Sequence, residues 1–125
     1  MKLLSIAVPC YNSQDYMRNC VDSLLKGGEL VEILIVNDGS KDDTAKIADE
    51  YAEKYPTIVR VIHQENQGAG AARNNGMDVA RGKYLAFLDA DDIWESDYLE
   101  CQKKLIEIYP DAGIYSTAFY SLEKG

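Results

Sequence analysis

The sequence predicts an α/β domain: a doubly wound, mostly parallel sheet with helices on both faces. Short, nearly continuous apolar runs of strand length alternate along the chain with segments whose apolar residues recur at helical spacing. The connections between these segments are short, and right-handed crossovers then place helices over both faces of the sheet. With 125 residues the chain is long enough for one such unit, so we expect residues 1–125 to form a single domain.

Each element follows from its own pattern. The expected strands are the apolar runs at residues 3–8, 31–36, 58–62 and 84–88, with a last strand near residues 112–119. The expected helices carry apolar stripes over residues 17–25, 47–55, 70–81 and 96–109. Gly27 and Gly28 end the first helix, and Pro56 closes the second. Ser40 or Asp42 could cap the start of the second helix.

Bulk properties exclude several classes of function. A formal net charge of -8 makes nucleic acid a poor partner, because phosphate backbones are bound by clustered Lys and Arg. The three cysteines, Cys10, Cys20 and Cys101, have no paired metal spacing, and we expect structural roles for Cys20 and Cys101. Reduced thiols fit the cytosol. No apolar run in this chain is long enough to predict a membrane segment.

The predicted sheet has one edge where ligands should bind. In open α/β sheets that edge lies outside the carboxyl ends of the strands. Polar segments follow the first four expected strands, at residues 9–12, 37–40, 63–68 and 89–92. We therefore expect these four segments to converge on one crevice.

The acidic segment Asp89-Ala90-Asp91-Asp92 is the sharpest of these features. Two carboxylates about 4 Å apart repel by roughly 4 kcal/mol at an effective dielectric near 20. Such a cluster favours a bound cation, and its oxygen ligands suit Mg²⁺ or Mn²⁺ bridging to a diphosphate. The alternative is helix capping by Asp92 with solvated charge around it.

The other strand ends allow two interpretations each. Asp38 with Gly39 could accept a hydrogen bond from a base or ribose, or could form only a turn before the next helix. Tyr11 could stack on a nucleobase or be an exposed turn residue. Arg73 could reach the crevice as a lone cation or form a surface ion pair. For His63 at a strand end we expect no ligand role.

Three further enzyme or signalling classes fit poorly. The first turn, residues 9–12, contains no glycine, which counts against NAD binding and, with the lack of lysine, against a nucleotidyltransferase. A phospho-acceptor signalling domain would need a lysine near the acidic strand ends, and none follows the last strand convincingly.

Together the four segments resemble the family 2 glycosyltransferases, which have the GT-A nucleotide-diphospho-sugar fold. The resemblance covers essentially the whole chain and rests on IAVPCYN, ILIVNDGSKDDT, ENQGAGAARNNG and YLAFLDADD in that order. Each string is weak alone, but four in this order and spacing are highly specific.

The resemblance implies a role for each matching residue. The loop with Tyr11 would bind the base, Asp38 would hydrogen-bond a pyrimidine, and Arg73 would lie against the nucleotide. Asp89 would lie near the ribose and Asp91 would coordinate the metal, with Asp89 as a second candidate ligand. The residues expected to bind the donor nucleotide are Pro9, Tyr11, Asn12, Asp38, Gly39, Arg73 and Asp89.

The resemblance also implies an activity. Such enzymes of glycan biosynthesis transfer a sugar from a nucleotide-diphospho-sugar, here most simply a UDP-sugar, to an acceptor hydroxyl with inversion and with Mn²⁺ or Mg²⁺. Their catalytic base lies downstream of the acidic segment, so we expect it beyond Gly125 and expect this chain to be a truncated, N-terminal part that holds the donor site. The alternative is a non-catalytic nucleotide-sugar-binding module. We further expect an exposed sheet edge near residues 112–119 that could form a homo-oligomer, and a cytoplasmic location, with the inner face of the membrane as an alternative.

Overall fold

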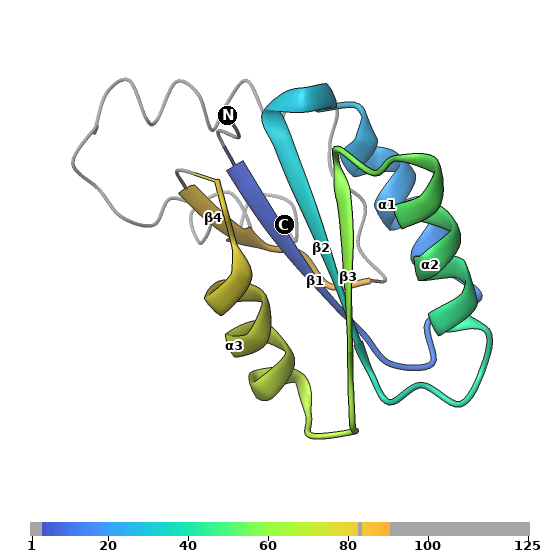
Figure 1. Cartoon of the computed structure of the whole chain (residues 1–125). Helices are drawn as coiled ribbons and strands as arrows, with labels where there is room; N and C mark the ends of the chain where they lie inside the picture. The colour runs from blue at the N-terminus through green and yellow to red at the C-terminus, as the bar shows by residue number, and fades with distance from the viewer. Residues whose placement is uncertain (1–3, 83, 91–125) are drawn as a thin grey trace, which may run out of the picture.

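The computed structural model describes residues 4–82 and 84–90 of the chain. These residues form a sheet of four parallel strands in the order β3-β2-β1-β4 (Figure 1). The strands are β1 (Leu4–Cys10), β2 (Val31–Asp38), β3 (Val59–Gln64) and β4 (Tyr84–Phe87). β3 and β4 are the edge strands of this part of the sheet.

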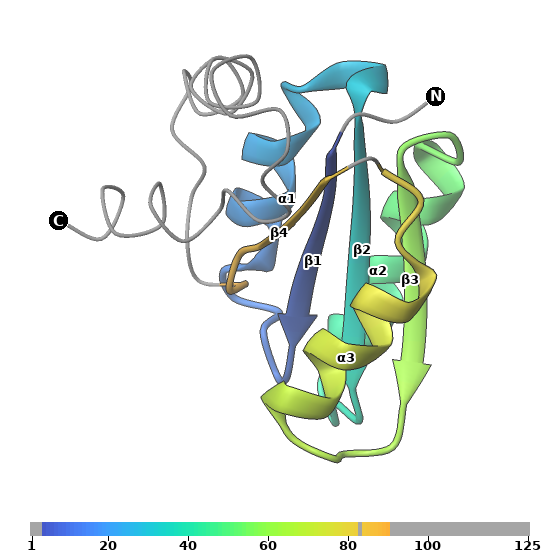
Figure 2. The same cartoon turned by 90° about the vertical axis from the view of Figure 1, so that its left-hand side faces the viewer.

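Helices cover both faces of the sheet, which confirms the predicted doubly wound α/β architecture. The helices α1 (Met17–Leu25) and α2 (Thr44–Lys54) lie on one face, and α3 (Ala69–Val79) lies on the other (Figure 2). A single 3-10 turn, η1 (Gly28–Leu30), joins α1 to β2. The four parallel strands therefore end at one edge of the sheet, where the predicted ligand-binding segments begin.

Two layers of apolar side chains hold the helices to the sheet, because successive strand residues point to opposite faces. The larger layer lies beneath α1 and α2, and its central members are Leu4, Ile6, Val8, Met17, Val21, Leu24, Ile33 and Ile35. The layer beneath α3 has smaller side chains. It includes Ala7, Val36 and Ala72, all fully buried.

The strands differ from their predicted limits mainly at their carboxyl ends. β1, β2 and β3 each extend two residues beyond the apolar run that predicted them, because backbone pairing continues through Pro9 and Cys10 in β1 and through polar residues in β2 and β3. β4 ends one residue early, although the Leu88 N–H still donates to the Ala7 carbonyl at 3.1 Å. The helix expected at residues 96–109 and the strand and sheet edge expected near residues 112–119 lie outside the described residues.

The start of α2 corrects one expectation. Asp42 accepts the Thr44 N–H at 2.9 Å and so supports the first turn of the helix. Ser40 does not cap α2, because its hydroxyl accepts the Asn12 N–H from the loop after β1 instead. Within residues 4–82 and 84–90 no helix is long and apolar enough to cross a membrane.

Candidate functional site: the carboxyl edge of the sheet

The loops that follow β1 and β2 are joined by reciprocal hydrogen bonds. The Asn12 N–H donates to the Ser40 hydroxyl at 2.9 Å, and the Asn12 side-chain oxygen accepts the Lys41 N–H at 2.8 Å. Asn12 has φ of 49°, in the left-handed region that asparagine tolerates better than most residues. Asn12 therefore couples the two loops, a structural role that the sequence pattern did not reveal.

Further contacts between these loops reinforce the coupling. The Ser13 N–H donates to the Thr44 hydroxyl at 2.7 Å, and Ser13 is buried. Gln14 donates its N–H to Asp42 at 3.3 Å and accepts the Asp43 N–H at 3.0 Å. The segment after β1 is thus held against the start of α2 along its length, which restricts where the Tyr11 ring can lie.

Asp38 organises the loop that follows β3. The residue is 5% exposed. Its Oδ1 accepts the Gln67 N–H at 2.7 Å and the Gln64 side-chain N–H at 2.8 Å, and its Oδ2 accepts the Gly68 N–H at 3.0 Å. Burial raises the pKa of the Asp38 carboxyl, but the hydrogen bonds from Gln67, Gln64 and Gly68 outweigh it and hold the pKa below its usual range. A charged carboxylate therefore lies just before the first turn of α3.

The loop that follows β3 also requires a glycine at position 39. Its φ is +68°, and a Cβ at this position would lie 2.6 Å from the backbone nitrogen of Asn66. The loop after β3 therefore rests directly on the backbone that follows β2. The sequence pattern suggested an unusual turn at Gly39 but gave no sign of the close contact with Asn66.

Arg73 and Asp89 bring α3 and the end of β4 together. The guanidinium Nη2 lies 3.5 Å from Asp89 Oδ1, and the two side chains are 44% and 45% exposed. An ion pair this long and this exposed contributes little to stability and separates at little cost. Both side chains therefore lie at solvent-accessible positions at the carboxyl edge of the sheet.

The remaining predicted site residues lie at the same edge or outside the described part. Tyr11 is 46% exposed and follows β1, whereas Pro9 is partly buried within that strand. Asp91 and Asp92 lie outside the described residues. His63, for which no ligand role was expected, lies 2.9 Å from Asp49 and 3.0 Å from the Asn37 amide through its two ring nitrogens.

Comparison with known proteins decides the family. The family model for glycosyl transferase family 2 matches residues 5–124. The chain belongs to this family. It is 50% identical over 98 residues to the putative glycosyltransferase EpsH of Bacillus subtilis, covering 78% of this chain and 28% of EpsH. It is 52% identical over 90 residues to the uncharacterized glycosyltransferase YibD of Escherichia coli, covering 71% of this chain and 26% of YibD. The chain thus spans just over a quarter of the length of these family members.

Solved structures of the GT-A type show the same fold. TarS 1-349 of S. aureus in complex with UDP-GlcNAc is 30% identical, with a TM-score of 0.75, covering 87% of this chain and 32% of that chain. The mannosyltransferase PcManGT of Pyrobaculum calidifontis, in complex with GDP-Man and Mn²⁺, is 24% identical with the same TM-score, covering 82% of this chain and 32% of that one. These likenesses confirm the predicted fold.

The carboxylate oxygens of the acidic segment at residues 89–92 are suitable ligands for a divalent metal cation. Among the described residues no group of three or more His, Cys, Asp or Glu is arranged to hold a metal ion. Asp89 nevertheless supplies a half-exposed carboxylate at the sheet edge, and Asp91 and Asp92 follow it in the sequence. Carboxylate oxygens are the ligands that Mg²⁺ and Mn²⁺ prefer, so the chemistry of Asp89 fits such an ion.

Proposed function

We propose that this chain binds the nucleotide-diphospho-sugar donor of a glycosyl transfer, and that the full-length enzyme transfers the sugar to an acceptor hydroxyl with inversion. The observation that carries the proposal is that Asp38 at the end of β2, Arg73 of α3 and Asp89 after β4 all lie at the carboxyl edge of one sheet, in a member of glycosyl transferase family 2. The UDP and UDP-GlcNAc complexes of TarS support a UDP-sugar as the donor.

Tyr11 and Asp38 are proposed to bind the base. Tyr11 is exposed and begins the loop that Asn12 and Ser13 hold in place, so its ring offers a preformed stacking surface. A carboxylate has about four acceptor positions, and donors among residues 4–82 and 84–90 use three of those of Asp38. We assign the fourth position, on Oδ2, to an N–H of a pyrimidine.

Arg73 and Asp89 are proposed to meet the ribose and the diphosphate. The arrival of a diphosphate would draw Arg73 toward its negative charge, because the present pair with Asp89 is long and exposed. Asp89 would then contact the ribose and a divalent cation, which Asp91 would coordinate. When bound, Mn²⁺ or Mg²⁺ would offset the charge of the leaving diphosphate.

The chemical step needs a part of the enzyme beyond these residues. A base must take the proton from the acceptor hydroxyl as it attacks the anomeric carbon. We propose that this base lies beyond Gly125 in the full-length protein, which would act in glycan biosynthesis in the cytoplasm or at the inner face of the membrane. A non-catalytic nucleotide-sugar-binding module is the second candidate, since the described residues account only for donor binding.

The donor site is tested by calorimetry. UDP is titrated into the chain with and without Mn²⁺, alongside GDP and dTDP. We expect metal-dependent binding of UDP that Asp91→Ala abolishes. The control is Asp78→Ala, which removes an exposed carboxylate from the opposite end of α3 and should leave binding unchanged. Equal binding with and without Mn²⁺, or unchanged binding in Asp91→Ala, would contradict the assignment of the metal site.

A further inference from the structure

A buried carboxylate, Glu32, lies at the edge of the sheet opposite the proposed donor site. It is the second residue of β2 and is 2% exposed. Its Oε2 accepts the hydroxyl of Ser5, its partner on β1, at 2.8 Å. Its Oε1 accepts Arg60 Nη1 from β3 at 2.7 Å. Three adjacent strands thus contribute to one buried polar cluster, which lies on the face that α3 covers.

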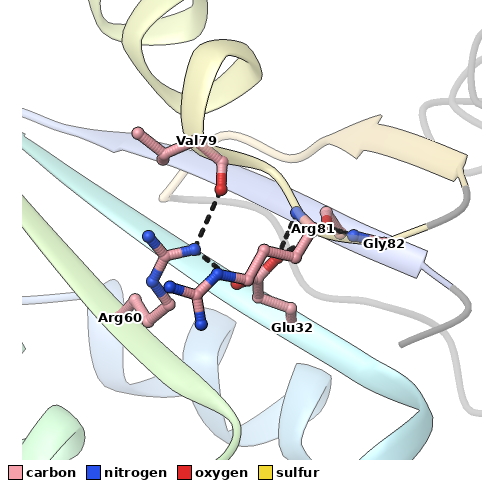
Figure 3. Close-up of polar contacts among 6 residues, drawn as sticks. Glu32, Arg60, Val79, Arg81 and Gly82 are labelled. Atoms are coloured by element: carbon pink, nitrogen blue, oxygen red, sulfur yellow. Dashed lines mark hydrogen bonds and ion pairs between the residues drawn. The ribbon is translucent and has the colours of Figure 1, made fainter. Parts of the chain in front are cut away.

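The turn between α3 and β4 ends on this cluster (Figure 3). The Arg81 N–H donates to Glu32 Oε2 at 2.8 Å, and the Gly82 N–H donates to the Ser5 hydroxyl at 2.7 Å. Arg60 Nη1 also donates to the carbonyl of Val79, the last residue of α3, at 2.9 Å. Side chains from the sheet therefore satisfy polar backbone groups of the turn that would otherwise need water.

Gly82 lets the turn lie directly against β1. A Cβ on Gly82 would be 2.6 Å from the Ser5 nitrogen and 2.8 Å from the Leu4 carbonyl carbon. Tyr84, two residues later, is already the register partner of Leu4 in the β1–β4 ladder. The anchored turn thus leads into β4, and Asp89 follows this strand at the carboxyl edge of the sheet, where the donor is proposed to bind.

Strand β2, which carries Glu32, also holds the N-terminal end of α3. Asp38 lies six residues after Glu32 on β2, on the same face, and binds the N–H groups of Gln67 and Gly68 just before the helix. The charges at the two ends also suit the helix dipole, with a carboxylate at the N-terminus and the Arg60 guanidinium at the last carbonyl. α3 is therefore fixed along its axis by two carboxylates of a single strand.

We propose that Glu32 is a positioning residue that sets the register of β4 on β1 and thereby the place of Asp89. A slip of one residue would turn Asp89 to the other face of the sheet. A slip of two residues would keep the face but move Asp89 by about 7 Å along β1, away from Arg73. The consequence for nucleotide binding rests on the proposed function, whereas the consequence for strand register does not.

The test compares Glu32→Gln with Tyr51→Phe. Glutamine keeps the size of the side chain but loses the charge that Arg60 and the Arg81 N–H meet. Tyr51→Phe removes a different hydrogen bond, from the Tyr51 hydroxyl to Asp22 at 2.7 Å, on the opposite face of the sheet. It controls for a general loss of stability. Both variants are studied at a temperature where each remains folded.

Amide hydrogen exchange, followed by NMR, reports the register. In Glu32→Gln we expect exchange at Arg81, Gly82 and Leu88 to accelerate about tenfold or more relative to the β2–β3 amides. Tyr51→Phe should leave that ratio unchanged. Calorimetry with Mn²⁺ should show UDP affinity reduced by about tenfold in Glu32→Gln and preserved in Tyr51→Phe.

Two results would overturn the inference. One is an acceleration in Glu32→Gln that is uniform over the whole sheet, since this would make Glu32 a general stabilising residue. The other is an unchanged UDP affinity despite selective loss of protection at Leu88, since Asp89 would then not depend on the anchor. If the unsubstituted chain binds no nucleotide, the proposed function fails, and the exchange pattern alone still decides whether Glu32 sets the register.

Discussion

Gly76 of α3 lies against Ala7 of β1 with no room for a side chain between helix and sheet. A Cβ on Gly76 would be 2.9 Å from the Ala7 Cβ and 3.6 Å from a methyl group of Val36. Both neighbours belong to buried strands that cannot move aside without disturbing the core on the other face. The distance between α3 and the sheet, and hence the height of Arg73 above the donor edge, is set at this contact.

Substitution of Gly76 should destabilise the chain even though alanine is the better helix former. We expect Gly76→Ala to lower the free energy of unfolding by about 1–3 kcal/mol, because the added methyl overpacks the contact with Ala7. Gly70→Ala in the same helix is the matched control. No atom lies within 4 Å of its added Cβ, so we expect a gain of up to about 1 kcal/mol. Urea unfolding measures both, and equal effects would contradict the close contact.

Asn12 should affect both stability and donor binding. Asn12→Ala removes the acceptor of the Lys41 N–H and places alanine at a positive φ, so we expect a loss of about 1–3 kcal/mol in the free energy of unfolding. Asn12→Gly relieves the backbone but also lacks the amide, and should recover only part of the loss. Both variants should weaken UDP binding in calorimetry, because the loops after β1 and β2 are no longer coupled. Full recovery in Asn12→Gly would show that the Lys41 hydrogen bond contributes nothing.

The hydrogen bonds to Asp38 should make stability depend on pH in the acid range. The folded-state pKa of Asp38 lies below its ordinary value of 3.8, because the bonds from Gln67, Gln64 and Gly68 outweigh the effect of burial. Their contribution is therefore fully present above that ordinary value and is lost as the pH falls through the lower folded-state pKa. We expect Asp38→Asn to be less stable than the unsubstituted chain near neutral pH, and the difference to shrink as the pH falls below about 4.

Urea unfolding over this pH range measures the Asp38 effect. Glu32 and Asp42 also have pKa values held below the ordinary range, but both remain in the variant and so cancel in the comparison. Asp78→Asn, the same change at an exposed position of α3, is the control and should show no such trend. A stability difference for Asp38→Asn that stays constant with pH would contradict the charged, hydrogen-bonded state of Asp38.

Cys10 should be inert toward thiol reagents in the folded chain. Burial, with a smaller effect from the nearby charge of Asp42, raises the pKa of the Cys10 thiol to about 12. Only the thiolate reacts, and at pH near 8 almost none is present. We expect iodoacetamide to leave Cys10 unmodified in the native chain and to label it in urea, as measured by mass spectrometry of the Cys10 peptide. Rapid native labelling would show that the end of β1 opens readily.

The fold was predictable because its strands are apolar on both faces and its helices on one. The stripe over residues 17–25 gave the limits of α1 correctly, since its apolar side chains are the ones that enter the core. The carboxyl ends of the strands were harder to predict. Asp38 and Gln64 pair through their backbones while their side chains serve the loops, and hydrophobic periodicity carries no information about such residues.

The position of the candidate residues at the sheet edge was predictable, but the contacts between them were not. Asp38, Gly39, Arg73 and Asp89 all follow or face the predicted edge, as the segment positions indicated. The coupling of Asn12 to Ser40 and Lys41 joins residues 28 and 29 positions apart, which no local pattern reveals. For Glu32 a signal did exist: it is the one charged residue within the otherwise apolar run of residues 31–36.

The strand order β3-β2-β1-β4 implies an order in which the strands of the sheet assemble during folding. β1, β2 and β3 follow one another both in the chain and across the sheet, so residues 4–64 already contain three paired strands and the two helices of one face. β4 must instead return to the free side of β1 after α3 has settled on β2, and such non-local pairing is slow. As the chain leaves the ribosome from its N-terminus, we expect the loops proposed to hold the base to be formed before Asp89 arrives. The newly made protein would then form the loops proposed to bind the base first, and would gain the carboxylate proposed to meet the ribose and the cation last.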